Sequence, residues 1–174
     1  MCIRDRINTV VPKELTHLFA RDMVQREFGK ILLVSSVAGY QATPTYAIYA
    51  AAKTNLLLFG EAMNFELRGS GVTASVVSPG MTRTEFLDVS GQKATFAQRL
   101  MMMESADVVR KGLRTMMRGK ASTVPGFMNK VMVVSAKLVP RNWPKWVAYA
   151  VMRNDDVPYS DRHKKFAPEP DGKQ

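Results

Sequence analysis

The sequence contains no run of about 18 or more consecutive apolar residues, the length that a membrane-spanning helix requires. Its start also lacks the basic segment followed by an apolar segment that marks a secretory signal. Cysteine is nearly absent: Cys2 is the only one, which excludes a disulfide framework and a metal site built on several cysteines. We therefore expect a cytoplasmic protein without a bound metal.

Residues 1–6 read Met-Cys-Ile-Arg-Asp-Arg and resemble the translated end of a sequencing adapter, as found at the edges of assembled metagenomic reads. Such a segment is set aside before the fold is considered, as a cloning scar would be. On this interpretation the natural sequence begins near Ile7, within a longer protein.

The chain has 174 residues, of which 46% are hydrophobic, so it can form one domain, or part of one, with a substantial core. Its net charge of +10 is uneven. Residues 1–104 contain 11 basic and 9 acidic residues, whereas residues 105–174 contain 14 basic and 6 acidic residues. The two parts thus carry +2 and +8, and the excess belongs to the C-terminal part.

Apolar spacing predicts helices and strands in alternation. Helical periodicity covers residues 8–27, 46–67 and 106–118, with Ser105 in the N-cap position of the last helix. Short branched apolar runs predict buried strands at 30–35, where we expect a central strand, at 72–78 and at 121–124. A short helical region is expected between the second strand and Ser105. This order predicts an α/β fold, the C-terminal half of a Rossmann-type doubly wound parallel sheet.

The predicted domains follow from these elements. We expect a partial Rossmann-type catalytic domain over residues 7–125, an amphipathic helical extension over 126–156, and a mobile polar tail over 157–174.

Tyr49 and Lys53 lie four residues apart in an Ala-rich helix, so their side chains share one face. A phenol ordinarily has a pKa of about 10, and a nearby ammonium favours its ionised form, which makes the pair usable for acid/base catalysis. The alternative is an ordinary amphipathic helix face. Ser36 follows the first predicted strand, at the sheet edge where α/β proteins bind ligands, or it is simply a strand-end cap.

Three segments in register carry a resemblance to a known family. They are Val34-Ser-Ser-Val-Ala-Gly39, Tyr49-Ala-Ala-Ala-Lys53 thirteen residues after Ser36, and Val76-Val-Ser-Pro-Gly80 followed by Thr84. In order and spacing they resemble the main, non-extended branch of the short-chain dehydrogenase/reductase family over residues 7–86, with looser similarity to Val124.

The resemblance implies a role for each matching position. Tyr49 would be the acid/base, Lys53 would assist it and bind the nicotinamide ribose, and Ser36 would hydrogen-bond the reacting oxygen. Asn8 would hold a water that relays protons to Lys53, unless it is an ordinary residue at a helix N-terminus. The predicted nicotinamide contacts, besides Tyr49 and Lys53, are Pro79, Gly80, Met81, Thr82 and Thr84.

The sequence departs from the family in three respects, because the resemblance implies three features before Asn8 that are not present. These are the glycine-rich phosphate turn, the residue that reads the adenosine ribose, and an Asn-Asn-Ala-Gly stretch; no Gly-x-x-x-Gly-x-Gly occurs in the sequence. The resemblance implies NADP or NAD as cofactor, with NADP preferred, and a full-length parent that interconverts an alcohol and a ketone or aldehyde. The 174-residue chain alone is expected to be inactive. The alternative is a non-catalytic fragment, or a membrane-binding or partner-binding protein that uses this fold.

The partners implied are a small carbonyl or alcohol substrate, of apolar character in one interpretation, and a second copy of the chain through the Tyr49 helix. We find no nucleic-acid-binding module. The basic, aromatic segment 127–153 could lie on an anionic membrane surface, cover an apolar substrate, or pack as a helical extension on the domain or a second subunit.

Overall fold

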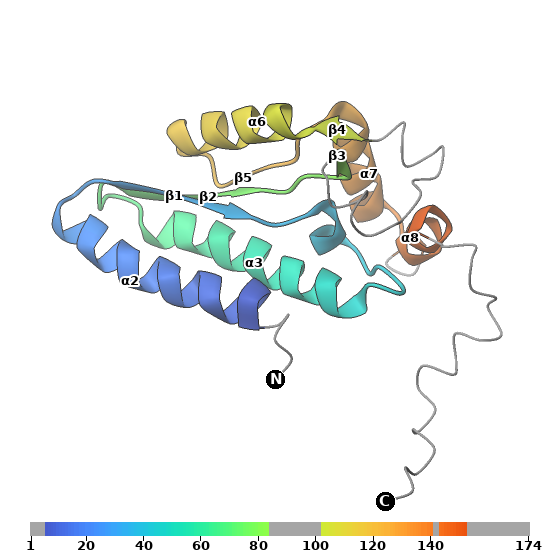
Figure 1. The fold of residues 1–174 in the computed structure, drawn as a ribbon, viewed down its shortest axis with the longest axis horizontal. Coiled ribbons are helices and arrows are strands. Elements are labelled where there is room, and N and C mark those ends of the chain that lie inside the picture. Colours follow the sequence, from blue (N-terminus) through green and yellow to red (C-terminus); the bar gives the residue numbers. More distant parts are fainter. Residues whose placement is uncertain (1–5, 84–101, 141–142, 153–174) are drawn as a thin grey trace, which may run out of the picture.

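The computed structural model describes residues 6–83, 102–140 and 143–152. Its centre is a parallel sheet with the strand order β1-β2-β5, formed by Gly29–Val34, Val72–Val77 and Ser122–Thr123. Helices α2 (Val11–Gln25) and α3 (Ala47–Glu66) cover one face, and α6 (Ser105–Met117) covers the other (Figure 1). The predicted α/β fold with a Rossmann-type parallel sheet is thereby confirmed.

The core lies between α3 and the sheet. Leu56 and Leu57 of α3 pack against Leu33 of β1 and Val76 of β2, and all four are almost fully buried. Gly60 allows this close packing, because a Cβ built there would lie 2.3 Å from Cγ2 of Val76. The Ala/Leu-rich composition of α3 thus supplies both helix propensity and a flat face for the sheet.

The first helix begins differently from the prediction. Residues Arg6–Val10 form a π-helical turn, and α2 starts at Val11, with Pro12 in its first turn, where a missing N–H costs nothing. The N-cap of α6 is also corrected: Glu104 occupies it, and the Ser105 hydroxyl donates instead to the Arg83 carbonyl at 2.7 Å.

The expectation that the first strand is central is wrong for the described sheet. β2 is the central strand, paired on both sides, whereas β1 pairs only with β2. Val34 keeps 52% of its surface exposed while Leu33 is buried, because successive side chains of a strand point to opposite faces and α3 covers the face of Leu33. Apolar composition alone predicted burial on both faces and could not show this.

A short parallel strand pair follows β2, and the sequence did not predict it. Strands β3 (Thr82–Arg83) and β4 (Met103–Glu104) pair in register, and the Arg83 guanidinium lies 3.3 Å from the Glu104 carboxylate. The pair ties the loop after β2 to the start of α6. The helical region predicted before Ser105 falls largely on residues 84–101, outside the described residues.

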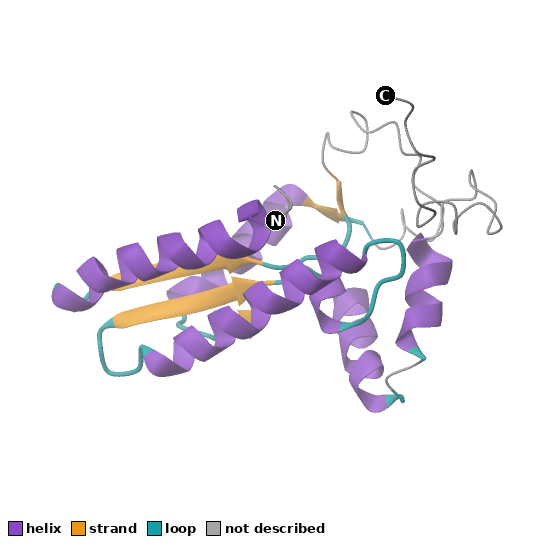
Figure 2. Cartoon of the chain, turned by 90° about the horizontal axis from the view of Figure 1, so that it is seen from below, coloured by secondary structure: helices purple, strands orange, loops and turns teal. Residues whose placement is uncertain are grey.

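Helices α7 (Phe127–Leu138) and α8 (Pro144–Met152) lie beyond the carboxyl ends of the strands (Figures 1 and 2). Both fall within the segment expected to be a helical extension, whereas the predicted polar tail lies outside the described residues. Among the helices described, none has the length and apolar content needed to cross a membrane.

Candidate active site

The loops that leave β1 and β2 are joined at the carboxyl edge of the sheet. The Ser35 amide donates to the Val77 carbonyl at 2.8 Å, and the Val37 amide donates to the Pro79 carbonyl at 3.0 Å. Ser36 therefore lies directly beside the loop that begins at Pro79. This is the edge at which ligands bind in open α/β sheets.

Ser36 is buried and caps a short 3-10 turn, Val37–Tyr40. Its hydroxyl oxygen accepts a hydrogen bond from the Ala38 amide at 3.2 Å. The capping role considered from the sequence is thus real. It is compatible with a second role, because a hydroxyl that accepts one hydrogen bond still has a proton to donate.

Tyr49 and Lys53 form a pair in the first turns of α3. The Lys53 ammonium lies 5.7 Å from the centroid of the Tyr49 ring. It also donates a hydrogen bond to the Val34 carbonyl at 3.0 Å, which anchors it at the end of β1. Burial lowers the pKa of the Lys53 ammonium. The Tyr49 side chain keeps 42% of its surface exposed and is therefore accessible to a substrate.

Two further residues fix the backbone of Lys53. The Ser35 hydroxyl donates to the Lys53 carbonyl at 2.7 Å, and a Cβ at Gly39 would lie 3.0 Å from that same carbonyl. The Gly39 carbonyl in turn accepts a hydrogen bond from the Thr54 hydroxyl at 2.9 Å. Ser35 and Gly39 belong to the segment that carries the resemblance, but nothing in their spacing signalled these contacts.

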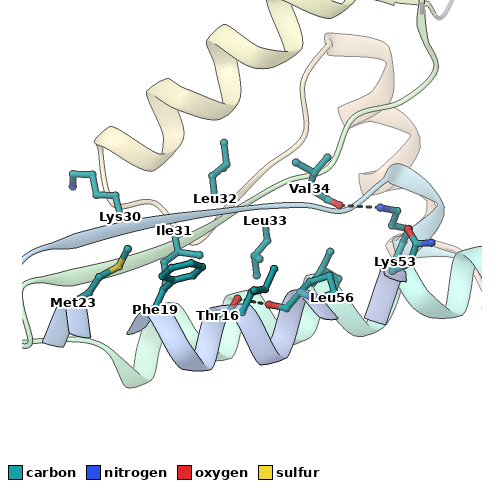
Figure 3. A pocket seen from close by; sticks show the side chains of 13 residues that line it. Thr16, Phe19, Met23, Lys30, Ile31, Leu32, Leu33, Val34, Lys53 and Leu56 are labelled. Atoms are coloured by element: carbon teal, nitrogen blue, oxygen red, sulfur yellow. Dashed lines mark hydrogen bonds between the residues drawn. The ribbon is translucent and has the colours of Figure 1, made fainter. Parts of the chain in front are cut away.

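Asn8 lines the same hollow as Lys53. This hollow of about 440 Å³ lies between α2, β1 and α3, and is mainly apolar. Figure 3 shows Lys53 at the end of the hollow near the carboxyl end of β1, hydrogen-bonded to the Val34 carbonyl, and Met23 toward the other end of the hollow. The structure thus brings Asn8 to the region where a relay to Lys53 would need it.

The loop after β2 has a defined conformation. The Pro79 carbonyl accepts from Val37, the Met81 carbonyl accepts from the Met103 amide at 3.0 Å, and the Thr82 hydroxyl donates to the Gly80 carbonyl at 3.2 Å. These contacts place four of the five loop residues predicted to touch a nicotinamide at the carboxyl edge. The fifth, Thr84, lies outside the described residues.

Asn129 of α7 supports this loop, and the sequence did not predict this role. The residue keeps only 2% of its surface exposed, and its side chain donates to the Pro125 carbonyl at 3.0 Å and to the Met103 sulfur at 3.6 Å. A Cβ at Gly80 would lie within 2.4–2.6 Å of the Asn129 amide atoms. Only the short pattern Pro-Gly-x-x-Asn could have signalled it, and that pattern says nothing about burial.

The residues present fit a nicotinamide ribose. A lysine ammonium has three donors, and the described contacts of Lys53 use one of them, on Val34. The other two donors can bind the hydroxyl oxygens of a ribose placed at the carboxyl edge. The backbone of Pro79 and Gly80 lies at the same edge, and the missing side chain of Gly80 makes room for the Asn129 amide beneath this loop.

Residues 6–95 match the profile of the short chain dehydrogenase family. An uncharacterized oxidoreductase of Myxococcus xanthus is 30% identical over 118 residues, which are 68% of this chain and 45% of that protein. The ketoacyl reductase HetN of Nostoc is 38% identical over 42% of this chain and 25% of its own length. The 3-oxoacyl-[acyl-carrier-protein] reductase MabA of Mycobacterium avium is 38% identical over 47% of this chain and 34% of its own length. The chain thus spans from a quarter to less than half of these relatives.

Solved structures show the same fold. A 7beta-hydroxysteroid dehydrogenase superposes with a TM-score of 0.67 at 25% identity, over 75% of this chain and 51% of that one. A short-chain dehydrogenase from Sphingobium yanoikuyae, in complex with NADPH, superposes with a TM-score of 0.60 at 25% identity, over 96% of this chain and 56% of that one.

Proposed function

Because the chain belongs to the short-chain dehydrogenase family, we propose that the whole protein is an NAD(P)-dependent oxidoreductase that interconverts an alcohol and a ketone or aldehyde. The observation that carries this proposal is the Lys53 ammonium beside the Tyr49 ring at the carboxyl edge of the sheet. Ser36 starts the loop that faces the same edge. A phenol, an ammonium and a hydroxyl in this place suit proton transfer to a carbonyl oxygen.

Each residue has a distinct role in the proposed reaction. In reduction, Tyr49 gives its hydroxyl proton to the substrate oxygen, and in oxidation it takes that proton back. Lys53 stabilises the negative charge that Tyr49 then carries, because an ammonium favours a nearby phenolate. Ser36 donates a hydrogen bond to the reacting oxygen. Asn8, which lines the hollow with Lys53, holds a water that returns a proton to Lys53.

The cofactor is held by the residues that border this edge. Lys53 and Tyr49 bind the ribose hydroxyls, and the backbone of Pro79, Gly80, Met81 and Thr82 lines the nicotinamide, whose carboxamide is hydrogen-bonded by Thr84, two residues further along the chain. When bound, the cofactor supplies the hydride. NADP is favoured over NAD because the Sphingobium relative was solved with NADPH.

The substrate class is proposed from the names of the relatives, and the assembly from the exposed surface of α3. Relatives named for ketoacyl and hydroxysteroid substrates support an apolar carbonyl compound. A homo-oligomer through α3 is supported by three large apolar side chains, Ile48, Leu58 and Phe65, each about 60% exposed on that helix.

We also propose that the 174-residue chain alone has negligible activity. Its sequence contains no Gly-x-x-x-Gly-x-Gly, and a glycine-rich turn is what lets a backbone approach the pyrophosphate of a dinucleotide.

A chimera tests this function. Residues 6–174 are joined to the N-terminal part of the Myxococcus relative that precedes its aligned region, and NADPH oxidation is followed with ketoacyl thioesters, steroid ketones and simple aldehydes. We expect the chimera to reduce at least one compound and the isolated chain to reduce none. A chimera that is folded and binds NADPH, yet reduces none of the compounds that the intact relative reduces, would contradict the proposal.

A further inference from the structure

The outward face of α7 is apolar along its whole length. Phe127, Val131, Val134 and Leu138 are spaced by four, three and four residues, which places them on one side of the helix. Their exposed fractions are 78%, 46%, 55% and 80%. The opposite side is anchored in the protein by the buried Asn129 and Val133. The apolar stripe is therefore held outward by a fixed helix.

Helix α8 extends this surface with aromatic side chains. Trp146 and Val147 are more than half exposed, as is Trp143 just before the helix, while Ala148 is buried. Figures 1 and 2 show α7 and α8 together at one end of the molecule. With 12 and 9 residues, neither helix has the length to cross a bilayer. Their geometry suits an attachment parallel to a surface.

The charge of this region has one sign. Residues 126–152 contain Lys130, Lys137, Arg141 and Lys145 and no acidic residue. Lysine side chains at the border of an apolar face can extend their ammonium groups toward an anionic surface while their aliphatic stems stay on the apolar side.

A cation-lined hollow adjoins the stripe. It measures about 490 Å³ and lies between α6 and α7, with Arg110, Lys111, Arg114 and Lys130 in its wall. The one acidic side chain in the wall, Asp107, is bonded to Arg110 at 2.7 Å. Phe127 and Lys130 line the hollow and also belong to α7, so the cationic hollow and the apolar stripe form one continuous surface. We call it the α7/α8 surface.

We propose that the α7/α8 surface attaches the protein to an anionic phospholipid membrane, with headgroup phosphates in the cationic hollow and the apolar stripe at the acyl boundary. An apolar stripe with tryptophans and a basic border is the composition of interfacial helices. A second copy fits less well, because each copy would bring the same positive surface to the contact. This inference goes beyond the proposed reaction and does not depend on it.

Flotation with vesicles tests the attachment on the full 174-residue chain. Vesicles contain phosphatidylcholine alone, or phosphatidylcholine and phosphatidylglycerol in equal parts. We expect about tenfold more binding to the anionic vesicles, reduced by added salt because surface charge is screened. The emission of Trp143 and Trp146 should shift to shorter wavelength on binding. Equal binding to both vesicles, or an unshifted emission with anionic vesicles, would overturn the proposal.

Matched variants locate the contact. Phe127→Ser with Leu138→Ser, and separately Arg114→Gln with Lys130→Gln, should each reduce binding about tenfold. Leu113→Ser with Met117→Ser removes two exposed apolar side chains of α6, and Arg68→Gln with Lys120→Gln removes two charges at the opposite end. Both control variants should bind as the unchanged chain does. The charge variants change only exposed groups and should fold even if the apolar variant does not.

Light scattering on the same proteins separates a lipid from a second copy. The mass of the free chain should be the same with and without the α7 substitutions. If those substitutions convert an oligomer into a monomer and anionic vesicles bind none of the proteins, the surface is an interface between copies and the membrane proposal is wrong.

Discussion

Lys53 combines two opposing requirements in one side chain. Its ammonium has to carry a charge to assist Tyr49, yet its burial lowers its pKa from the ordinary value. The hydrogen bond to the Val34 carbonyl and the neighbouring Tyr49 ring hold the group in place but carry no compensating negative charge. A ribose and a phenolate would supply polar partners only in the assembled site.

This burial predicts a pH dependence of stability. Because the pKa of Lys53 in the folded state is lower than the ordinary lysine pKa of 10.5, the folded state holds the Lys53 proton less strongly than the unfolded state does. The unfolded chain then binds more protons, so the free energy of unfolding rises with pH in the window just below 10.5. Burial raises the pKa of Tyr40 and so contributes with the opposite sign near pH 10, which makes the comparison between variants the test. In urea titrations the free energy of unfolding should change more positively with pH in the unchanged chain than in Lys53→Met. Lys120→Met, an exposed control, should keep the pH dependence of the unchanged chain.

Gly80 and Asn129 are predicted to be coupled. Gly80→Ala should destabilise the protein by about 1–3 kcal/mol, because the new methyl group would overlap the buried Asn129 amide. Asn129→Ser frees that space, so the double variant should lose less than the sum of the two single losses. Additive losses in urea unfolding would show that the two residues do not share the space.

The sequence predicted some of these residues and could not predict others. The sequence could predict Ser36, Tyr49 and Lys53 as candidate site residues, because their residue types and their spacing are recognisable within a short stretch of chain. Asn129 was not, because its importance comes from a contact with Gly80 that forms only when α7 folds over the loop after β2. Ser35 and Gly39 act through the Lys53 carbonyl, which has no side-chain signature.

At the scale of elements, α3 positions the candidate site through its packing on β1 and β2. Gly60 marks the closest approach, since a Cβ there would lie 2.3 Å from Val76 and 2.9 Å from Leu33. Helix propensity and packing therefore make opposite demands at this position. Packing should dominate, because the core side chains have little room to move.

The substitution Gly60→Ala tests that conclusion. Propensity alone would stabilise the helix by about 1 kcal/mol, but overpacking against Val76 should cost about 1–3 kcal/mol. We expect a net loss in thermal unfolding, recovered in part by adding Val76→Ala. The control Ala51→Gly, at an exposed position of α3, should lose about 1 kcal/mol from propensity alone. A stabilised Gly60→Ala protein would show that the packing is loose.

Helices and strands were predicted correctly where a periodic apolar pattern extends over many residues. They were missed where a strand exists only through pairing with another segment. The helices at α2, α3 and α6 and the strands β1 and β2 lie within a few residues of the expected ranges. β3 and β4 were missed, because two-residue strands have no periodicity and exist only through their mutual pairing. The edge position of β1 depends on which segments pair with it, which no local pattern shows.

At the scale of the molecule, the candidate active site and the α7/α8 surface lie at the same end of the sheet. Lys137 of α7 lies 5.4 Å from the ring of Tyr40, in the turn that Ser36 caps. The two proposals thus share one side of the protein, although they rest on different residues. An apolar substrate held in a membrane would meet the site from that side.

The measurement that tests the central claim most directly is the kcat/KM of the active chimera as Tyr49→Phe and as Tyr46→Phe. Tyr46 lies one turn before Tyr49, is 36% exposed and has Ala50 rather than a lysine four residues later, so it is a matched control. Removal of the Tyr49 hydroxyl should lower kcat/KM at least about 100-fold, as expected for a general acid, and should weaken NADPH binding far less, because Lys53 still binds the ribose. Tyr46→Phe should remain within about twofold of the unchanged protein, as expected for a residue outside the proton transfer. Equal, small losses in the two variants would contradict the assignment of Tyr49 as the acid/base.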